Sequence, residues 1–464
     1  MNAPTIWIII PLGLAFILFL LPSRDWVKYV AFSIMVLFAT MAIALPVETT
    51  FQMGETMIKI TPSLTILGRR FNIDSGDQIL LALLYFSTAL WLLAPKLAQT
   101  SQRFYSIAIG VTVILLASLS VEPFLYAALF IETGVLLIIP LLVKRGQSWS
   151  GAIRFLIFMS LAMPLILFSG WLLSGIEANP GDITLVRQVV ILLAIGFAFL
   201  LAIFPLHSWI PKLTESSSLW VVGFVLWIFP TAIQLFGIGF IDRYSWLRDS
   251  PSLQQTLLTT GIMMILFGGV MAGFQRHLGR IFGFAVMVET GFSLLSIGLG
   301  SSTGIELFIS MLLPRVISLC IWAYALEILS CSSVSLRFRD IKGLARQHPF
   351  AASGLVLSHL SMAGLPLLVG FPLRQYLLEA TAAISSSYSL LIMIGLVGLF
   401  ISVLRSLASL VMAPEKIIWT AQENIPQRIF LSIGSLSLII LGIFPQWAKP
   451  LLAQVPFLFD HIGR

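Results

Sequence analysis

The stretch FAFLLAIFPLHSWIPKLTESSS, residues 197–218, decides the interpretation of the whole chain. It predicts an apolar helix that reaches Pro205, breaks around His207 and Trp209, and stops at Pro211. Proline lacks a backbone N–H and crowds the preceding turn, so a membrane-length helix has to bend or open there. Such a break either lines a pathway or is a plain kink, since proline is common in membrane helices.

Composition decides the class of protein. Hydrophobic residues make up 58% of the 464 residues and charged residues 10%, and the mean hydropathy is +1.00. A chain of this composition cannot present the polar surface of a water-soluble domain. Its cations stand singly between apolar runs and form no basic block of the kind that binds nucleic acid. The sequence therefore predicts an all-α polytopic membrane protein with no nucleic-acid partner.

Apolar runs long enough to cross a bilayer recur along the chain, each bounded by Gly, Pro or charge. We expect fourteen spans, at 5–22, 27–46, 77–95, 104–121, 123–143, 152–175, 187–210, 219–240, 254–275, 280–300, 305–331, 351–371, 386–413 and 428–452. The first has no basic region or cleavage site beside it, so we expect it to be retained. Residues 47–76 are predicted to form a small surface hairpin.

The distribution of cations predicts how the bundle is oriented, because cytoplasmic loops carry the excess of Lys and Arg. Loops after even-numbered spans hold few cations, mainly Lys59, Arg69, Arg70, Arg187, Arg243 and Arg248. Loops after odd-numbered spans hold more: Arg24, Lys28, Lys96, Arg103, Lys144, Arg145, Arg154, Lys212, Arg276, Arg280, Arg337, Arg339, Lys342, Arg346, Lys416 and Arg428. Both termini are therefore expected on the periplasmic or luminal side.

A second interrupted helix is predicted between Leu360 and Arg374. Its breakers are Gly364, Pro366, Gly370 and Pro372. Two broken spans in corresponding places are typical of transporters built from inverted repeats, although two unrelated kinks would leave the same pattern. The expected units are three N-terminal helices with a long external loop (1–103), a first repeat broken at Pro205 (104–240), a second broken at Pro366 (254–413), and a C-terminal helix (414–464).

Ionisable residues inside the apolar spans are few, and each is costly in hydrocarbon. They are Glu132, Glu289, Arg315, Arg374 and Arg405. A buried carboxylate is held neutral by desolvation and ionises when a cation approaches, so the two glutamates are suited to pass protons. Arginine keeps its proton and can only stabilise a carboxylate or order water. A structural ion pair between helices is the alternative for each, and it stays open for Glu289 and Arg315.

Other side chains add little chemistry. His207 lies at the first break and His359 near the second, and we interpret His207 as a hinge residue more readily than as a proton relay. Cys320 and Cys331 lack the spacing of a metal or redox motif. The sequence contains no nucleotide-binding loop, no metalloprotease motif and no paired Cys/His set. We therefore assign no catalytic and no metal-binding residues.

Several segments resemble the antiporter-like membrane subunits of respiratory complex I and its photosynthetic relatives, a family shared with Mrp-type sodium/proton antiporters. The similarity covers roughly residues 105–410. It lies in ALFIETGVLLIIPLL (128–142), IFPLHSWIPKLTESS (203–217), FQRHLGRIFGFAVMVETGFSLLSIGLG (274–300) and RDIKGLARQHPFAASGLVLSHLSMAGLPLLVGFPLRQYLL (339–378). The last of these is the most specific match.

The resemblance implies proton translocation within a multi-subunit membrane complex, with NAD(P)H or ferredoxin as electron donor and quinone as acceptor. Quinone and the redox centres would belong to partner subunits, and this chain would carry no cofactor. The membrane would be a bacterial inner membrane or a thylakoid membrane. Because the chain ends soon after the last span, a middle-type or smaller subunit is expected. An Mrp-type antiporter subunit that moves sodium, or a hydrogenase-linked membrane complex, is the alternative.

The chain departs from the family pattern at its titratable positions. Leu200 stands where the family has a lysine that partners the fifth-helix glutamate, and the eighth helix has no lysine. Arg374 replaces another lysine, and Glu289 replaces a histidine. Span eleven has Leu313, Arg315 and Ile317 where relatives place His or Lys. Two hypotheses follow: a modified pathway with Glu132 and Glu289 as carriers beside fixed arginines, or a non-pumping scaffold.

Overall fold

Helices dominate the structure because the long apolar runs satisfy their backbone hydrogen bonds internally, as a hydrocarbon environment requires. The computed structural model describes residues 2–21, 26–45, 47–48, 50–53, 56–95, 101–143, 148–178, 183–412, 419–448, 459 and 461. Five cations used to predict the orientation lie outside these residues: Arg24, Lys96, Lys144, Arg145 and Lys416.

Among the described residues, the first half of the chain forms seven α-helices before the first break and two after it, a short one and a long one. They are α1 (Ile10–Leu20), α2 (Trp26–Ala44), α3 (Gln78–Leu93), α4 (Phe104–Ser120), α5 (Ala127–Leu142), α6 (Ser150–Ala178), α7 (Ile183–Leu200), α8 (Trp209–Ser216) and α9 (Leu219–Arg243). Short π- or 3-10-helical turns precede α1, α5 and α8, at η1 (Thr5–Ile9), η2 (Phe124–Tyr126) and η3 (Leu206–Ser208).

The second half repeats the pattern of long helices with one interruption. It comprises α10 (Ser245–Arg248), α11 (Pro251–Phe274), α12 (Leu278–Gly298), α13 (Ser302–Ser332), α14 (Leu344–Gln347), α15 (Pro349–Ala363), α16 (Gly370–Ile384), α17 (Ser386–Val411), α18 (Ile425–Ile443) and η4 (Pro445–Ala448). The predicted span 351–371 was wrong at its C-terminal side, because α15 ends at Ala363 and a separate helix, α16, continues to Ile384.

Within the described residues, nine helical segments are long and apolar enough to cross a membrane, including α9, α12 and α13. Shorter apolar helices accompany them: η1 with α1, α3, α4, α7 and α15. The predicted class, an all-α integral membrane protein that crosses the bilayer several times, is confirmed.

The strands form two hairpins where the sequence predicted one. β1 (Thr50–Met53) pairs with β2 (Thr56–Lys59), and β3 (Ser63–Ile66) pairs with β4 (Arg69–Asn72). β4 also pairs with β5 (Val121–Glu122), which follows α4. The second hairpin turns at Leu67 and Gly68, which both have positive φ, +50° and +74°. A two-residue turn of this kind matches the twist of paired strands.

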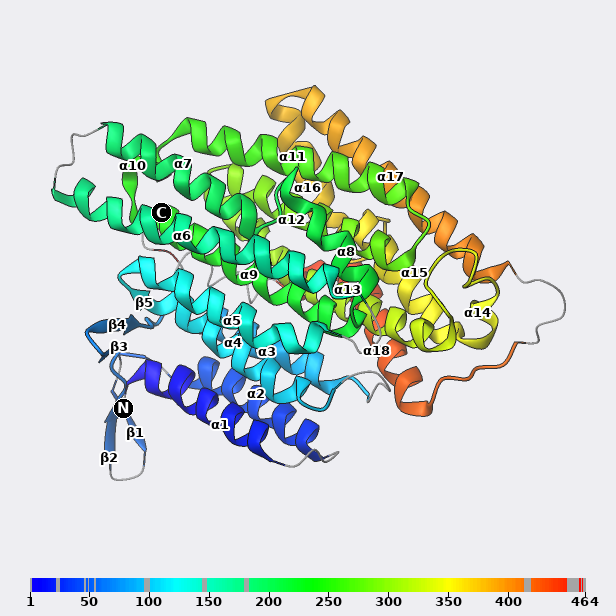
Figure 1. Ribbon diagram of the computed structural model, residues 1–464, viewed down its shortest axis with the longest axis horizontal. Coiled ribbons are helices and arrows are strands. Elements are labelled where there is room, and N and C mark those ends of the chain that lie inside the picture. Colours follow the sequence, from blue (N-terminus) through cyan, green and yellow to red (C-terminus); the bar gives the residue numbers. More distant parts are fainter. Residues whose placement is uncertain are drawn as a thin grey trace.

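The helices run between two ends of the molecule (Figure 1). The strands and α10 lie at one end, called the strand end here, and α14 lies at the other, called the α14 end. Asn2 forms a bridge with Thr61, and the His461 N–H donates to Asp242 Oδ1 at 2.9 Å. Both ends of the described chain therefore lie at the strand end.

Helices α9 and α12 form the centre of the bundle. In their most apolar stretches 94% and 100% of the residues are buried, compared with 17% in α18. Helix α12 packs against α8, α11 and α13, and α9 packs against α4 and α13. Polar side chains on α9 and α12 are thus removed from lipid and have to find partners inside the protein.

Candidate functional site

The first break separates α7 from α8. Helix α7 ends at Leu200, and a turn with Ala202 in the left-handed region (φ +53°) and a cis Phe204–Pro205 peptide leads to η3. The prediction that the helix reaches Pro205 was wrong, because the proline ring clashes with the carbonyl of the preceding helical turn and the helix ends upstream.

The helix that follows the first break also differs from the prediction. Helix α8 begins at Trp209 and runs to Ser216, so the predicted stop at Pro211 was wrong. Pro211 lies in the first turn of α8, where the missing N–H has no consequence because those N–H groups lack intrahelical partners. The break therefore spans residues 201–208 and reorients the chain before α8.

His207 lies inside this break, as predicted. Its half-buried ring is stacked against Phe204, with ring centroids 5.7 Å apart, and meets Phe267 of α11 edge-on at 4.8 Å. In the part of the chain that the structure describes, its Nδ1 has no hydrogen-bond partner. Aromatic rings thus hold the imidazole on two sides, which fits a hinge position.

Of the four predicted breakers, two lie in the second break and two in the first turn of the helix after it. Gly364 ends α15 with a positive φ of +79°, Pro366 lies in the turn, and Gly370 and Pro372 open α16. Leu367 also has a positive φ, +74°. The Val369 N–H donates to the Leu438 carbonyl of α18 at 3.0 Å, so a neighbouring helix satisfies part of the opened backbone.

A buried ion pair lies beside the second break. Arg374 Nη2, near the start of α16, donates to Glu289 Oε1, near the middle of α12. Arg374 Nη1 donates to the Gly370 carbonyl at 3.0 Å, and the guanidinium lies over the Phe292 ring with 5.1 Å to its centroid. Both side chains are buried. The pair ties α16 to the centre of the bundle.

Arg315 approaches the same region from α13. Its Nη2 lies 3.3 Å from Thr290 Oγ1, and its Nη1 lies 3.5 Å from both Ser293 Oγ and Gln234 Oε1. These partners, on α12 and α9, are neutral. Two arginines and one carboxylate therefore surround the middle of α12, and we call Glu289, Arg315 and Arg374 the central cluster.

The central cluster has more hydrogen-bond donors than acceptors. Among the described residues, Arg315 Nε, Arg374 Nε and Gln234 Nε2 have no hydrogen-bond partner. All three side chains are buried. Buried N–H groups of this kind are the sites that ordered water occupies in protein interiors.

His359 is also buried, on α15 before the second break. Its Nε2 lies 2.9 Å from Ser402 Oγ of α17, and its ring stacks on Trp322 of α13 with 4.2 Å between centroids. Arg405, farther along α17, donates to the Gly273 carbonyl at the end of α11 and lies over the Phe338 ring. Arg405 therefore ties α17 to the end of α11, outside the central cluster.

Glu132 lies apart from the central cluster, on α5. Ser160 Oγ of α6 donates to its Oε1 at 2.6 Å, and no cation lies within ion-pairing distance of it among the described residues. Leu200, where the resemblance places a lysine, is buried at the end of α7. The structure thus brings together Glu289, Arg315 and Arg374 of the predicted site residues, and leaves Glu132 in a neutral environment.

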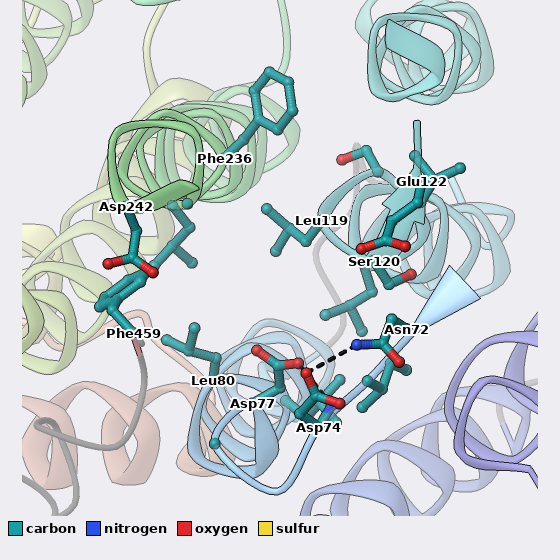
Figure 2. Close-up of a pocket in the computed structure, with 18 of the residues that line it drawn as sticks. Asn72, Asp74, Asp77, Leu80, Leu119, Ser120, Glu122, Phe236, Asp242 and Phe459 are labelled. Carbon is teal, nitrogen blue, oxygen red and sulfur yellow. Dashed lines mark hydrogen bonds between the residues drawn. The ribbon is translucent and has the colours of Figure 1, made fainter. Parts of the chain in front are cut away.

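A polar cavity opens at the strand end, with a volume of about 510 Å³. Figure 2 shows the carboxylates of Asp74, Asp77, Glu122 and Asp242 around it, with Leu119 and Phe236 between them. Glu122 pairs with Arg243 at 3.4 Å. The carboxylates come from the loop before α3, from β5 and from the end of α9.

A second polar cavity, of about 410 Å³, opens at the α14 end. Its lining includes Glu215 of α8, His277 before α12, Glu327 of α13, and Asp340 in the loop that leads to α14. Sequence reasoning missed Glu327. A carboxylate inside the apolar run CIWAYALEIL was the available signal, and its place near the end of the predicted span concealed it. The two cavities lie at opposite ends of α9.

Comparisons with known proteins identify similar chains. Residues 181–402 match the family described as NADH:quinone oxidoreductase/Mrp antiporter, transmembrane. NADH-quinone oxidoreductase subunit N of Thiobacillus denitrificans is 24% identical over 416 residues, which cover 83% of this chain and 84% of the relative. NAD(P)H-quinone oxidoreductase subunit 2 of Prochlorococcus marinus is 26% identical over 353 residues, covering 69% of this chain and 68% of the relative.

Solved structures share the fold at lower identity. A chain of the Mrp complex from Dietzia sp. superposes with a TM-score of 0.79 at 16% identity, over 99% of this chain and 97% of that chain. A chain of respiratory complex I from Thermus thermophilus gives a TM-score of 0.74 at 17% identity, over 98% and 99% of the two chains.

Proposed function

We propose that this chain is a proton-translocating, antiporter-like subunit of a complex I-type quinone oxidoreductase, because residues 181–402 match the NADH:quinone oxidoreductase/Mrp antiporter family and the similar curated chains are subunits of such enzymes. Its partners are then the other membrane subunits of that complex and the surrounding lipid. The electron donor, NAD(P)H or ferredoxin, and the quinone react at redox centres in those partners. This chain contributes a membrane pathway and no cofactor.

The observation that carries the proposal is the central cluster beside a broken helix. Ionisable groups are costly in a membrane interior, and they persist there mainly where they pair or line a pathway. Glu289 forms an ion pair with Arg374, and Arg374 stands near the start of α16, directly after the second break. A movement of α16 at the break would open the ion pair and let Glu289 take up a proton.

In this mechanism Glu132 and Glu289 carry protons, and water fills the breaks around Pro205 and Pro366. Arg315 and Arg374 are fixed cations, because arginine keeps its proton at accessible pH. His207 and His359 flank the two breaks as polar groups that orient water. Leu200 is apolar, so the first half of the pathway lacks a titratable partner for Glu132. We therefore propose that proton transfer through Glu132 is slower than in relatives that have a lysine at this position.

The topology that fits this function has fourteen spans, two inverted repeats, and both termini on the periplasmic or luminal side of a bacterial inner membrane or a thylakoid membrane. The bounds of the repeats are 104–240 and 254–413. The α14 end then faces the cytoplasm or its chloroplast equivalent. Its described cations, among them Lys212, Arg280, Arg337 and Arg339, support that orientation.

Sided labelling tests the orientation. Val334, fully exposed at the α14 end, is changed to cysteine in a Cys331→Ser background, since Cys331 is itself exposed. We expect an impermeant maleimide to label Val334→Cys in inside-out membrane vesicles and not in sealed right-side-out vesicles. Labelling only in right-side-out vesicles would reverse the orientation. Labelling after detergent treatment gives the maximum signal for both preparations.

Glu132→Gln tests conduction. We expect potential-driven proton uptake into vesicles that contain the intact complex to slow roughly tenfold or more, because loss of a proton-transferring group commonly costs about 10²–10⁴ in rate. Glu379→Gln, an exposed carboxylate on α16, is the matched control and should leave uptake unchanged. Wild-type uptake in Glu132→Gln would sink the conducting mechanism and support a non-pumping scaffold.

Two further measurements separate the alternatives. Repeating uptake with and without sodium distinguishes proton translocation from sodium exchange of the Mrp type. Mass spectrometry of the purified complex identifies the partners: quinone-reductase subunits support the proposal, and a set of small membrane subunits supports an Mrp-type antiporter.

A further inference from the structure

We propose that Glu327 is the inner proton acceptor of the cavity at the α14 end, and that this cavity is the inlet for protons on that side of the membrane. The inference rests on the proposed function and names a residue for it. The cavity, called the inlet here, joins elements from both halves of the chain: α8 and the start of α9 from the first, and α13 and the loop before α14 from the second.

The inlet is large and polar enough for water. Its volume of about 410 Å³ leaves room for on the order of ten water molecules. Hydroxyl groups of Thr214, Ser330 and Ser335 stand among its charged lining groups. The cavity extends from an exposed mouth, at Val334 and Arg337, to the buried wall of α13, and water held by such groups would connect the two.

Glu327 forms that buried wall. It is 1% exposed, and its Oε2 accepts the backbone N–H of Trp220 in the first turn of α9 at 3.2 Å. Glu327 therefore sits where the inlet meets the central helix of the bundle. The same helix α13 carries Arg315 twelve residues earlier, about 18 Å along the axis at 1.5 Å per residue. One helix thus links the inlet to the central cluster.

The other ionisable groups of the inlet are fixed in one protonation state near neutral pH. Burial alone raises the pKa of Glu215, but Arg280 at 2.8 Å and Lys212 at 3.4 Å outweigh it and hold that pKa below its ordinary value. Burial lowers the pKa of His277 to about 4. The hydrogen bond from Ser335 lowers the pKa of Asp340. Glu215 and Asp340 stay ionised and His277 stays neutral.

A purely structural role for Glu327 is the competing explanation. A carboxylate at a helix N-terminus satisfies an N–H group without an intrahelical partner and interacts favourably with the helix dipole. Glutamine keeps an oxygen that can accept the Trp220 N–H, but it cannot carry a proton. The substitution Glu327→Gln therefore separates the two roles.

The test measures initial proton uptake into vesicles that contain the intact complex, with Glu327→Gln, Glu327→Ala and the control Glu379→Gln. We expect Glu327→Gln to slow uptake roughly tenfold or more while the complex keeps wild-type heat stability in detergent. Glu327→Ala should lose both uptake and stability, because the Trp220 N–H loses its acceptor. Glu379→Gln should behave as wild type in both measurements.

Wild-type uptake in Glu327→Gln would overturn the inference and leave Glu327 as a helix cap. Comparison with Glu132→Gln keeps this failure distinct from failure of the proposed function. If Glu132→Gln slows uptake and Glu327→Gln does not, the chain conducts protons by another inlet. If Glu132→Gln also keeps wild-type uptake, conduction through this chain is itself refuted.

Discussion

Glu289→Gln is expected to destabilise the protein strongly and to lower the yield of assembled complex. The substitution removes the one carboxylate of the central cluster and leaves Arg315 and Arg374 buried as like charges, with no counter-ion among the described residues. Removing one partner of a buried ion pair costs about 3–5 kcal/mol, because the remaining charge stays desolvated. The measurement is the fraction of complex that stays intact on size-exclusion chromatography after heating in detergent.

The control variants change the net charge of the central cluster in different ways. Arg374→Met removes a cation and leaves Glu289 facing Arg315 with no net charge, so its cost should be smaller than that of Glu289→Gln. The double variant Glu289→Gln/Arg374→Met restores the wild-type net charge of the cluster, and we expect it to be more stable than Glu289→Gln alone. Equal stability of Glu289→Gln and wild type would mean that Glu289 is protonated in the resting protein.

The sequence allowed the breaks to be predicted because their causes are local. Glycine and proline change the backbone's freedom wherever they occur: Gly364 and Pro366 lie in the second break, and Gly370 and Pro372 lie in the first turn of the helix that follows it. The bounds of the first break were less predictable. Helix α7 ends at Leu200 because the effect of Pro205 reaches back into the preceding turn, and α8 tolerates Pro211 because helix starts need no donor there.

The sequence did not indicate which of the charged residues form an ion pair. Glu289, Arg315 and Arg374 stood out as costly residues in apolar spans, but an ion pair of Glu289 with Arg315 was as acceptable as any other. The structure pairs Glu289 with Arg374, 85 positions away, and among the described residues Arg315 makes its hydrogen bonds to neutral groups. That choice depends on the rotation of α12 and α13 and on the direction of α16 after the break, for which no local signal exists.

Gly370→Ala is expected to disrupt the second break and the central cluster together. A Cβ atom at residue 370 would overlap the Ser361 carbonyl oxygen of α15 and Arg374 Nη1. At Gly364, a Cβ would come within 2.8 Å of Arg374 Cδ, and the positive φ of this residue adds strain for any other side chain. The two glycines thus provide the space through which the Arg374 side chain reaches Glu289. The Arg374 side chain can shift away from an added Cβ at residue 370. The Ser361 carbonyl belongs to the backbone of α15 and cannot, so α15 and α16 have to move apart.

We expect Gly370→Ala to lower heat stability by an amount comparable to Glu289→Gln, because overpacking typically costs about 1–3 kcal/mol and the displaced arginine loses its partner as well. The control is Gly239→Ala on α9, where no atom lies within 4 Å of the added Cβ. The double variant Gly370→Ala/Arg374→Met should be less destabilised than the sum of its single variants, since the arginine is then absent from the contact. If Gly370→Ala matches Gly239→Ala in both stability and proton uptake, the break does not position Arg374, and opening the ion pair by movement of α16 is not how Glu289 would receive a proton.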